Sequence, residues 1–326
     1  MSGVLVFGAI AEGKLLGASL EVAAAGQGLA RAMGVTLFGG LIGSDCASAA
    51  QLLAVAGVAE LFVADNARHV PYVADLHIAA AEAIIRKCEP AVVLLPQTAE
   101  TSEWVPALAA RLNAAMATAC TRLVYDGERV VVTRPVCGGA VQGEYAFNRP
   151  LQIATMSPGA CAPIAPSDAC PICPVAVPNV EPRVTVLEQV VDEANAGPRL
   201  NSARVVVSGG LGIGSRENWR LIDETAAALG AAIGATRAVV ELGWVPSSRQ
   251  VGFSGQKVSP ELYIAVGISG AVHHLAGIAG AKTIVAINKD PEASIFRAAR
   301  FGVIGDAKEI VPAFVERVKE LRANQA

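Results

Sequence analysis

The sequence predicts an α/β protein built from two doubly wound domains with mostly parallel sheets. Short apolar runs alternate with Ala-rich segments of helical character, as strands and helices do in such domains. The length of 326 residues exceeds the size at which one hydrophobic core normally keeps growing. A segment rich in proline and then in charge interrupts the alternation past the middle of the chain. Two separate α/β layers are therefore expected.

The first domain is predicted to cover residues 1–192. Its strands are expected at the apolar runs, where buried parallel strands need near-continuous hydrophobic sequence. These runs are residues 4–8, 35–41, 60–63, 91–95, 130–133 and 151–155. From residue 163 to about residue 198 the pattern gives way to prolines and charges. Few core contacts need to cross such a segment, so we place the domain boundary near residue 192.

The second domain, residues 193–326, begins with a strand that runs from Ala203 into a glycine-rich turn ending at Gly214. A helix follows, with one apolar face and Gly230 as its stop signal. That face holds Trp219, Ile222, Ala226 and Leu229, and further strands are expected at 238–241, 262–266 and 283–287. A last helix is predicted with Asp290 as N-cap, Pro291 in its first position and Gly302 after its end.

Composition excludes two classes of partner. Hydrophobic residues make up 53% and charged residues 17%, yet no apolar run approaches the roughly 18 residues of a membrane span without interruption. The net charge of -3 and the lack of a dense Lys/Arg run argue against nucleic acid. The chain starts on a strand without the features of a secretory signal. We expect a cytoplasmic protein with no membrane insertion and no nucleic-acid partner.

The seven cysteines are an odd number spread along the chain, which argues against a disulfide framework. Cys170 and Cys173 have the spacing of a redox or zinc pair, but no second pair or nearby histidine completes a site. A plain structural role is the favoured interpretation, and redox or zinc chemistry is the alternative.

A turn from Gly267 to Gly270, followed by a helix from about Ala271, carries the first functional signal. Glycines let the backbone approach a ligand closely, and the first N–H groups of a helix have no partner within the helix. An anion can bind there. The alternative is a strand-to-helix turn without a ligand.

Other polar clusters end the strands of the same domain. The run from Ser208 to Gly214 sits where a dinucleotide fingerprint would, but its glycine spacing differs and no acidic residue follows at the expected distance. This argues against a standard NAD site. Thr236-Arg237, residues 250–257 and Asn288-Lys-Asp290 are expected to converge on one crevice, because the carboxyl ends of parallel strands share one edge.

From about residue 205 to residue 310, the chain resembles the alpha subunit of electron-transfer flavoprotein. The resemblance rests on Ser-Gly-Gly-x-Gly, Gly-Ala-Thr-Arg, Gln-Val-Gly-x-Ser-Gly, the stretch from residue 261 to 277 and Asn-Lys-Asp-Pro-Glu-Ala. The first domain is similar more loosely, in the segment from Thr133 to Gly139. The resemblance implies a Rossmann-like second domain that binds FAD, and a first domain that contacts a beta subunit. It also implies single-electron transfer from a flavin dehydrogenase, such as an acyl-CoA dehydrogenase of fatty acid oxidation, to a quinone-linked or other acceptor.

The resemblance also implies roles for individual residues. Arg237 matches an arginine beside the isoalloxazine and should raise the reduction potential of the flavin. Ser254 would offer its hydroxyl to flavin N5, and His274 would donate toward the C2 carbonyl, where negative charge accumulates on reduction. The backbone at Ser269 and Gly270 would hold the pyrophosphate. The full set of expected cofactor contacts is Leu211, Thr236, Arg237, Gln250, Val251, Gly252, Phe253, Ser254, Gly255, Gly267, Ser269, Gly270, Ala271, Val272, His273, His274, Asn288, Asp306 and Ala307.

Two positions depart from the family pattern. Leu211 stands where the family commonly has arginine, which removes a charged contact toward the phosphate or ribose region of the cofactor. His273 stands where the family commonly has glutamine, and a histidine there would add a pH-dependent term to the flavin potential. Asn288 and Asp306 match positions that hold the ribityl and adenosine parts.

Alternatives remain open from the sequence. Taken singly, Arg237 could form a surface ion pair, Ser254 could be a turn hydroxyl and His274 could bond to a carbonyl. A dehydrogenase would need its own acid or base, for which His69 and His77 are the other histidines. A scaffold without cofactor and an NADH-oxidising bifurcating form are further alternatives. No catalytic motif and no metal site is expected, so we predict an electron carrier and not an enzyme.

Overall fold

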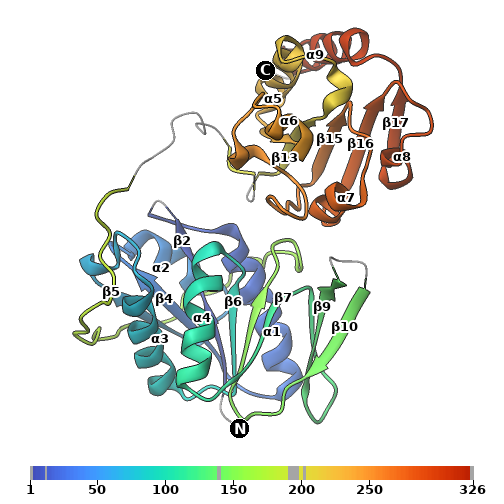
Figure 1. Ribbon diagram of the computed structural model, residues 1–326. Helices are drawn as coiled ribbons and strands as arrows, with labels where there is room; N and C mark the ends of the chain where they lie inside the picture. Colours follow the sequence, from blue (N-terminus) through green and yellow to red (C-terminus); the bar gives the residue numbers. More distant parts are fainter. Residues whose placement is uncertain (1–2, 12, 138–140, 190–197, 201–202, 324–326) are drawn as a thin grey trace. The chain divides into compact units, whose positions relative to one another are not determined.

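The computed structural model describes residues 3–11, 13–137, 141–189, 198–200 and 203–323. It divides into two compact units, Met1–Val190 and Val191–Ala326, called here the amino-terminal and the carboxy-terminal unit (Figure 1). The boundary predicted at residue 192 lies outside the described residues, as do Gly138 and Gly139 of the segment that resembles the family.

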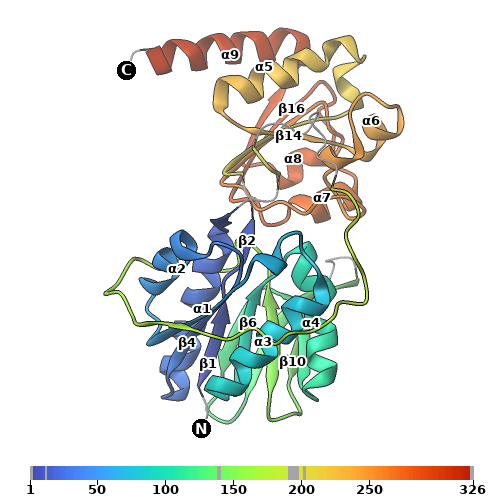
Figure 2. The ribbon, with the colours of Figure 1, turned by 90° about the vertical axis from the view of Figure 1, so that its left-hand side faces the viewer.

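The amino-terminal unit is built on a seven-stranded sheet in the order β12-β5-β4-β1-β6-β11-β7, with every neighbouring pair parallel. Alternate residues of β1 enter two core clusters, one on each face of the sheet. α1 and α2 cover one face and α3 and α4 the other (Figures 1 and 2). The strands are β1 (Val4–Phe7), β4 (Leu37–Gly43), β5 (Glu60–Asp65), β6 (Val92–Pro96), β7 (Ala115–Cys120), β11 (Gln152–Met156) and β12 (Ile172–Pro174). The helices are α1 (Gly17–Met33), α2 (Ala47–Ala54), η1 (Ala67–His69), α3 (Ala74–Cys88) and α4 (Ala99–Arg111), and β2 (Ile10–Ala11) pairs with β3 (Lys14–Leu15).

A small antiparallel sheet corrects one prediction. The strand predicted at 130–133 exists as β9 (Val130–Val136), but it pairs antiparallel with β8 (Arg122–Tyr125) and β10 (Val141–Ala146), outside the large parallel sheet. A tight turn reverses the chain between β8 and β9. Gly127 has φ +101°, and the Asp126 carboxylate accepts two backbone N–H groups of the turn, each at 2.9 Å.

The proline-rich segment that begins at residue 163 lies mostly in the amino-terminal unit. Its strand β12 extends the edge of the large sheet beside β5. The Asp75 carboxylate accepts hydrogen bonds from the backbone N–H of Arg183 at 2.9 Å and from its guanidinium Nη2 at 2.7 Å. Cys170 packs into the core on one face of the sheet and Cys173 into the core on the other. The two thiols therefore do not face each other, as expected for residues three apart in an extended chain.

All seven cysteines are free thiols. Within the described ranges, no three His, Cys, Asp or Glu side chains form a group able to hold a metal ion. No helix of these ranges combines the length and the apolar content needed to cross a membrane.

The carboxy-terminal unit has a parallel five-stranded sheet in the order β14-β13-β15-β16-β17. α5 and α9 pack on one face, and α7 and α8 pack on the other. The chain order reverses between β13 and β15, the place where open α/β sheets bind ligands. The strands are β13 (Val205–Gly209), β14 (Ala232–Ala235), β15 (Leu262–Val266), β16 (Thr283–Asn288) and β17 (Phe301–Ile304). The helices are η4 (Leu211–Ile213), η5 (Glu217–Trp219), α5 (Arg220–Leu229), α6 (Arg237–Glu241), η6 (Ser247–Arg249), α7 (Val272–Ile278), α8 (Ile295–Ala298) and α9 (Ala307–Ala323).

Two elements predicted for this unit are wrong. Residues 238–241 were expected as a strand, but they lie in α6, where only Val239 is buried. The strand at this edge of the sheet is β14, whose Ala-Ile-Gly-Ala sequence gives little strand signal. The helix predicted from Asp290 to Gly302 is replaced by turns, the short α8 and β17. Asn288 accepts the backbone N–H of Asp290 and Asp290 that of Glu292, so side chains hold turns here, and Gly302 pairs with Ala286 in the sheet.

Candidate functional site

Two glycine-containing loops meet at the carboxyl ends of β13 and β15. The backbone N–H of Gly210 donates to Val266 O and that of Gly212 donates to Gly267 O, both at 2.9 Å. A Cβ on Gly210 would lie 2.4 Å from Gly267 O. Gly267 has φ +63°, and a Cβ there would lie 2.6 Å from the backbone nitrogen of Ile213. Only glycines allow this approach, which fixes the chain between β15 and α7.

The turn before α7 leaves backbone donors available. α7 begins after Ala271, which has no side chain able to cap the helix, and no backbone hydrogen bond to the rest of the described chain uses the N–H groups of residues 269–272. Ser269 is exposed, and its carbonyl accepts the N–H of Ile295 at 3.0 Å. Gly270 has φ +86°, and a Cβ there would lie 2.3 Å from the Ile295 nitrogen. Free N–H groups at the start of a helix form a site for an anion.

The loop of residues 250–256 packs against α7. The backbone N–H of Phe253 donates to His273 O at 2.7 Å, and a Cβ on Gly277 would lie 2.5 Å from Gly252 Cα. At the surface of this loop, Gln250 Nε2 donates to Ser254 Oγ at 3.0 Å. The Ser254 hydroxyl therefore still has its own proton to donate.

His274 lies inside the same contact. Its side chain is 7% exposed, its Nδ1 lies 3.1 Å from Val251 O and its Nε2 lies 3.0 Å from the Tyr263 hydroxyl. Since a carbonyl can only accept, Nδ1 carries the proton and Nε2 accepts from Tyr263. Burial lowers the pKa of His274 to about 4, so the ring is neutral at pH 7. Tyr263 is a member of this site that sequence reasoning missed, because it reads as one more apolar residue of a buried strand.

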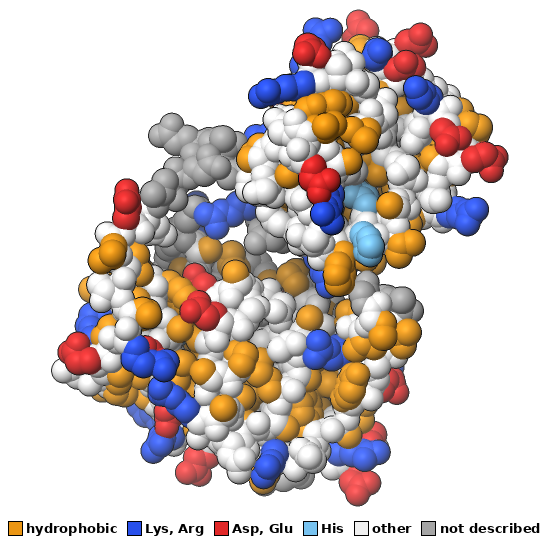
Figure 3. Space-filling model, in the orientation of Figure 1, with side chains coloured by type: hydrophobic (Ala, Val, Ile, Leu, Met, Phe, Trp, Pro, Cys, Tyr) orange, Lys and Arg blue, Asp and Glu red, His pale blue; other side chains and the backbone are white. Residues whose placement is uncertain are grey.

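Histidine side chains are visible on the surface of the carboxy-terminal unit, bordered by hydrophobic side chains (Figure 3). His273 is exposed, and its ring lies beside that of Phe253 with 5.8 Å between the ring centroids. Phe253 is itself 52% exposed. The turn and the loop together therefore present an aromatic surface next to the free backbone donors.

Arg237 follows Thr236 at the end of β14. The backbone N–H of Thr236 donates to Gly209 O at 3.1 Å, which attaches this end to β13. The guanidinium Nε of Arg237 donates to Glu241 Oε1 at 2.7 Å, in a pair whose side chains are 70% and 58% exposed. Such an exposed pair contributes little stability, so it does not account for the residue by itself.

Asn288 and Asp306 end the last two strands. Asn288 is buried, its Nδ2 donates to Ile268 O at 2.8 Å and its Oδ1 accepts the N–H of Asp290 at 3.0 Å. Asp306 precedes α9, and its Oδ1 accepts the N–H of Lys308 at 2.9 Å. All the predicted contact residues thus lie after the carboxyl ends of the strands of one parallel sheet. Leu211 follows β13, Thr236, Arg237 and residues 250–255 follow β14, and Gly267 and residues 269–274 follow β15. Asn288 is the last residue of β16, and Asp306 and Ala307 follow β17.

The other histidines are core residues. His69 and His77 are 2% and 9% exposed, and His77 packs against Tyr72 with 4.8 Å between the ring centroids. Burial lowers the pKa of His77 to about 4. His69 Nδ1 lies 2.9 Å from Gly43 O, and its buried Nε2 has no hydrogen-bond partner among the described residues.

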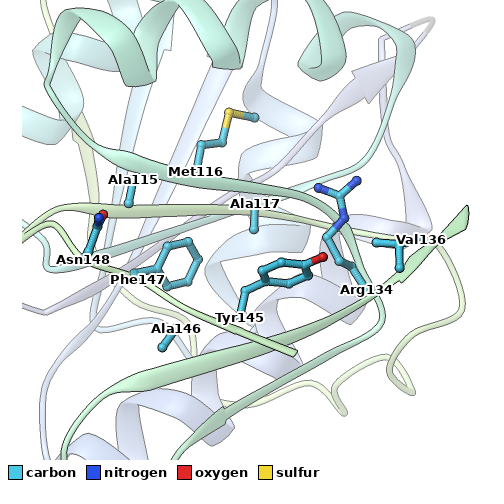
Figure 4. Close-up of a pocket in the computed structure, with 9 residues that line it drawn as sticks. All are labelled: Ala115, Met116, Ala117, Arg134, Val136, Tyr145, Ala146, Phe147 and Asn148. Carbon is cyan, nitrogen blue, oxygen red and sulfur yellow. The ribbon is translucent and has the colours of Figure 1, made fainter. Parts of the chain in front are cut away.

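The amino-terminal unit also carries a cavity of about 640 Å³ beside β7, β9 and β10 (Figure 4). The hydroxyl of Tyr145 points toward the Arg134 side chain in this cavity (Figure 4). Arg134 Nε is buried, and no described residue accepts its proton. The lining residues are Ala115, Met116, Ala117, Arg134, Val136, Tyr145, Ala146, Phe147 and Asn148.

Comparison with known proteins gives a consistent result over nearly the whole chain. Residues 199–279 match the family described as the electron transfer flavoprotein FAD-binding domain, and residues 4–180 match the electron transfer flavoprotein domain. The chain is 35% identical over 322 residues to the electron transfer flavoprotein subunit alpha of Bacillus subtilis, covering 98% of each protein. It is 36% identical over 320 residues to the subunit of the same name from Mycobacterium tuberculosis, covering 98% of this chain and 99% of that protein. Protein FixB of Clostridium saccharobutylicum is 35% identical over 326 residues, covering 98% of this chain and 97% of that protein.

Proposed function

The chain belongs to the alpha-subunit family of electron-transfer flavoproteins, and from this premise we propose that it forms a heterodimer with a beta subunit and carries single electrons. The donors would be flavin dehydrogenases, such as the acyl-CoA dehydrogenases of fatty acid oxidation, and the acceptor would be quinone-linked. The FAD-binding domain supplies the cofactor site. The observation that carries the proposal is the turn at residues 269–272, where the start of α7 has no side-chain cap. Glycines in and beside this turn let neighbouring loops approach it closely.

FAD fits these residues. Its diphosphate is an anion, and the turn has free backbone donors at the start of α7, with no side chain in their place. Gly252 has φ +149°, and Gly267 and Gly270 also have positive φ, so the loops come closer to each other than side chains would allow. Bound FAD supplies the one-electron chemistry, and the residues of the chain bind it and adjust its charge environment.

The individual roles are part of the proposal. Arg237 places a permanent positive charge near the isoalloxazine and favours its reduced, anionic form. Ser254 uses its remaining proton to donate to flavin N5. For His274, the structure adds a condition to the expected donation toward the C2 carbonyl. The neutral ring has one N–H, and Val251 O accepts it, so donation to the flavin requires the ring to exchange that partner.

We propose an electron carrier and not an enzyme with its own substrate. Support comes from the site, where the hydroxyl of Ser254 contacts Gln250 and not a base. The hydroxyl that contacts His274 belongs to Tyr263, which is fully buried and out of reach of a substrate. The scaffold alternative loses its support, because the turn and glycine contacts that an anion would need are intact. The free state of all seven cysteines supports the expected cytoplasmic location.

The beta-subunit contact is proposed on the amino-terminal unit. β10 is an edge strand of the antiparallel sheet, and Val141 and Tyr145 on it are 52% and 47% exposed. Exposed apolar side chains beside a cavity are typical of an interaction surface. Tyr145→Asp should weaken assembly of the heterodimer in size-exclusion chromatography. A heterodimer that forms with unchanged affinity would remove this surface from the proposal.

The test of the proposed function is stepwise reduction of the protein purified with its beta subunit, followed by visible absorption. FAD bands that pass through a one-electron-reduced form before bleaching are expected. Arg237→Ala should lower the midpoint potential by about 59 mV, which corresponds to a tenfold change in a one-electron equilibrium. Arg317→Ala is the matched control, because Arg317 and Glu320 form a pair of similar exposure, 65% and 53%, on α9. A complex that takes up no added FAD would overturn the proposal.

A further inference from the structure

We infer that Lys308, in the first turn of α9, supplies the positive charge toward the anionic, ADP-bearing part of FAD in this chain. It does so in place of the arginine that the resemblance to the family implies at the position of Leu211. The inference rests on the proposed arrangement of FAD in the carboxy-terminal unit. It concerns a residue outside the set predicted from the sequence.

The side chain of Lys308 lies over the loop that contains Leu211. Its Cε and Nζ are 3.8 Å and 3.9 Å from the position of a Cβ placed on Gly214. Gly214 closes the same turn, because its backbone N–H donates to Leu211 O at 3.0 Å. α9 also contacts η4. The ammonium group of Lys308 and the 49% exposed side chain of Leu211 therefore belong to one small surface.

The backbone places Lys308 beside the predicted adenosine contacts. Asp306 Oδ1 accepts the N–H of Lys308 at 2.9 Å, and Ala307 lies between the two residues. This hydrogen bond fixes the start of α9 at the carboxyl end of β17. The charge thus sits at the same edge of the sheet as the residues expected to hold the ribose and adenine.

Lys308 shares the first turn of α9 with the acidic Glu309 and follows Asp306, which reduce but do not reverse the effect of the helix dipole on its charge. A cation in the first turn of a helix opposes the helix macrodipole, which favours acidic residues there. None of the ion pairs found in the described part of the chain involves Lys308. A bound diphosphate would offset the cost, because a phosphate near both the lysine and a helix N-terminus is stabilised by each.

The test compares Lys308→Met with Lys319→Met in the complex with the beta subunit. Lys319 is an exposed lysine farther along the same helix, so it controls for the loss of one surface charge. FAD is removed and titrated back at two salt concentrations. We expect Lys308→Met to raise the dissociation constant of FAD about tenfold and to make it less salt-dependent, while Lys319→Met leaves both unchanged. Equal affinities for the two variants would overturn the inference.

Two further measurements separate charge from folding. The thermal stability of Lys308→Met without FAD should equal or exceed that of the unchanged protein, since the substitution removes a charge that opposes the helix dipole. A loss of FAD affinity that comes with a loss of this stability would count against a binding role. Leu211→Arg in the Lys308→Met background should restore FAD binding, and no restoration would overturn the replacement of one cation by the other. If the unchanged complex takes up no FAD at all, the proposed function fails before the inference is tested.

Discussion

The turns from β6 to α4 and from β15 to α7 both connect a buried central strand to a helix, but they end differently. α4 begins with a capping box, in which Thr98 Oγ1 accepts the N–H of Thr101 at 3.1 Å and Thr101 Oγ1 accepts the N–H of Thr98 at 2.8 Å. α7 begins after Ala271 with no side-chain cap. The chain satisfies the donors at the start of α4 with its own side chains. At the start of α7 no described side chain does so, and there we propose that a ligand binds.

In a third turn, the one before α2, a charged side chain of the protein satisfies the backbone donors. The carboxylate of Asp65 accepts the backbone N–H groups of Asp45 and Cys46 at 2.9 Å each, just before α2. A side-chain anion thus occupies the place that a phosphate would take at an open helix start. The lack of a side-chain cap is not special to α7, because α1, α3, α5, α6 and α8 also begin without one. The start of α7 differs because it follows a glycine turn at the place where the strand order of its sheet reverses, which is where such sheets bind ligands.

The largest effect is expected from adding a side chain at the open turn. Gly267→Ala would place a Cβ 2.6 Å from the Ile213 nitrogen and 2.7 Å from the Gly212 carbonyl carbon, in a backbone of φ +63°. We expect it to lower the free energy of unfolding of the carboxy-terminal unit by about 2–5 kcal/mol and to abolish FAD binding. Urea unfolding and FAD titration measure the two effects.

Gly230→Ala is the control for the cost of placing alanine in a backbone of positive φ. Gly230 has φ +64°, nearly that of Gly267, and no atom lies within 4 Å of its Cβ position. Gly230→Ala should lower the free energy of unfolding of the carboxy-terminal unit by only about 1–2 kcal/mol, and FAD binding should be retained. Equal losses of unfolding free energy in the two variants would show that the close approach of the loops after β13 and β15 does not contribute to the effect of Gly267→Ala.

Acidic pH should weaken both units through their buried histidines. Burial lowers the pKa of His77 and of His274 to about 4, below the ordinary value of 6.5. Because the folded pKa is the lower one, each histidine contributes stability that is full above pH 6.5 and is lost as the pH falls toward 4. Between pH 7.5 and 5 we expect a loss of about 1–2 kcal/mol for each. His77→Asn should flatten the dependence of the amino-terminal unit alone and His274→Gln that of the carboxy-terminal unit alone. Unchanged slopes in urea unfolding at several pH values would contradict this.

Adding a cap to α7 and removing the cap of α4 should have smaller and opposite effects on FAD affinity and on stability. Ala271→Asp gives α7 a capping carboxylate where FAD phosphate is proposed to bind, so FAD affinity should fall about tenfold while stability without FAD holds or rises. Ala271→Ser adds a neutral cap and should lower affinity less. Thr98→Ala removes the cap of α4 and should cost about 1 kcal/mol in unfolding of the amino-terminal unit, with FAD affinity unchanged. An Ala271→Asp protein that binds FAD normally would refute the comparison.

What the sequence could predict follows from the kind of signal each element carries. The strands at 262–266 and 283–287 are confirmed as β15 and β16, because buried parallel strands require apolar runs. The helix ending at Gly230 is confirmed, since its periodicity and its left-handed C-cap are both local properties. β14 was missed and 238–241 misassigned because an Ala/Gly strand and a short helix with one buried residue carry almost no local signal.

The backbone of the candidate site was predictable from the sequence, but its side-chain contacts were not. The turn from Gly267 to Gly270 and the helix start at Ala271 follow from glycine positions, and the structure has both. The partners of His274 did not follow, because Val251 and Tyr263 come from other segments and meet it only in the folded unit. The position of Lys308 over Gly214 has the same origin. Contacts between distant segments depend on tertiary packing, which neither periodicity nor spacing encodes.

The smallest effect is expected from His273, the exposed neighbour of the buried His274. His273 is exposed, and its ring lies beside that of Phe253 at the surface of the site, with 5.8 Å between the ring centroids. His273→Gln keeps a polar side chain at this place and removes the ring contact, so the midpoint potential of the flavin should change by less than about 59 mV, since exposed groups interact by less than about 1 kcal/mol. Potentiometric titration of the two complexes measures the change, with Lys319→Met as a surface control. A larger change would show that the exposed ring of His273, unlike a surface residue, acts directly on the flavin.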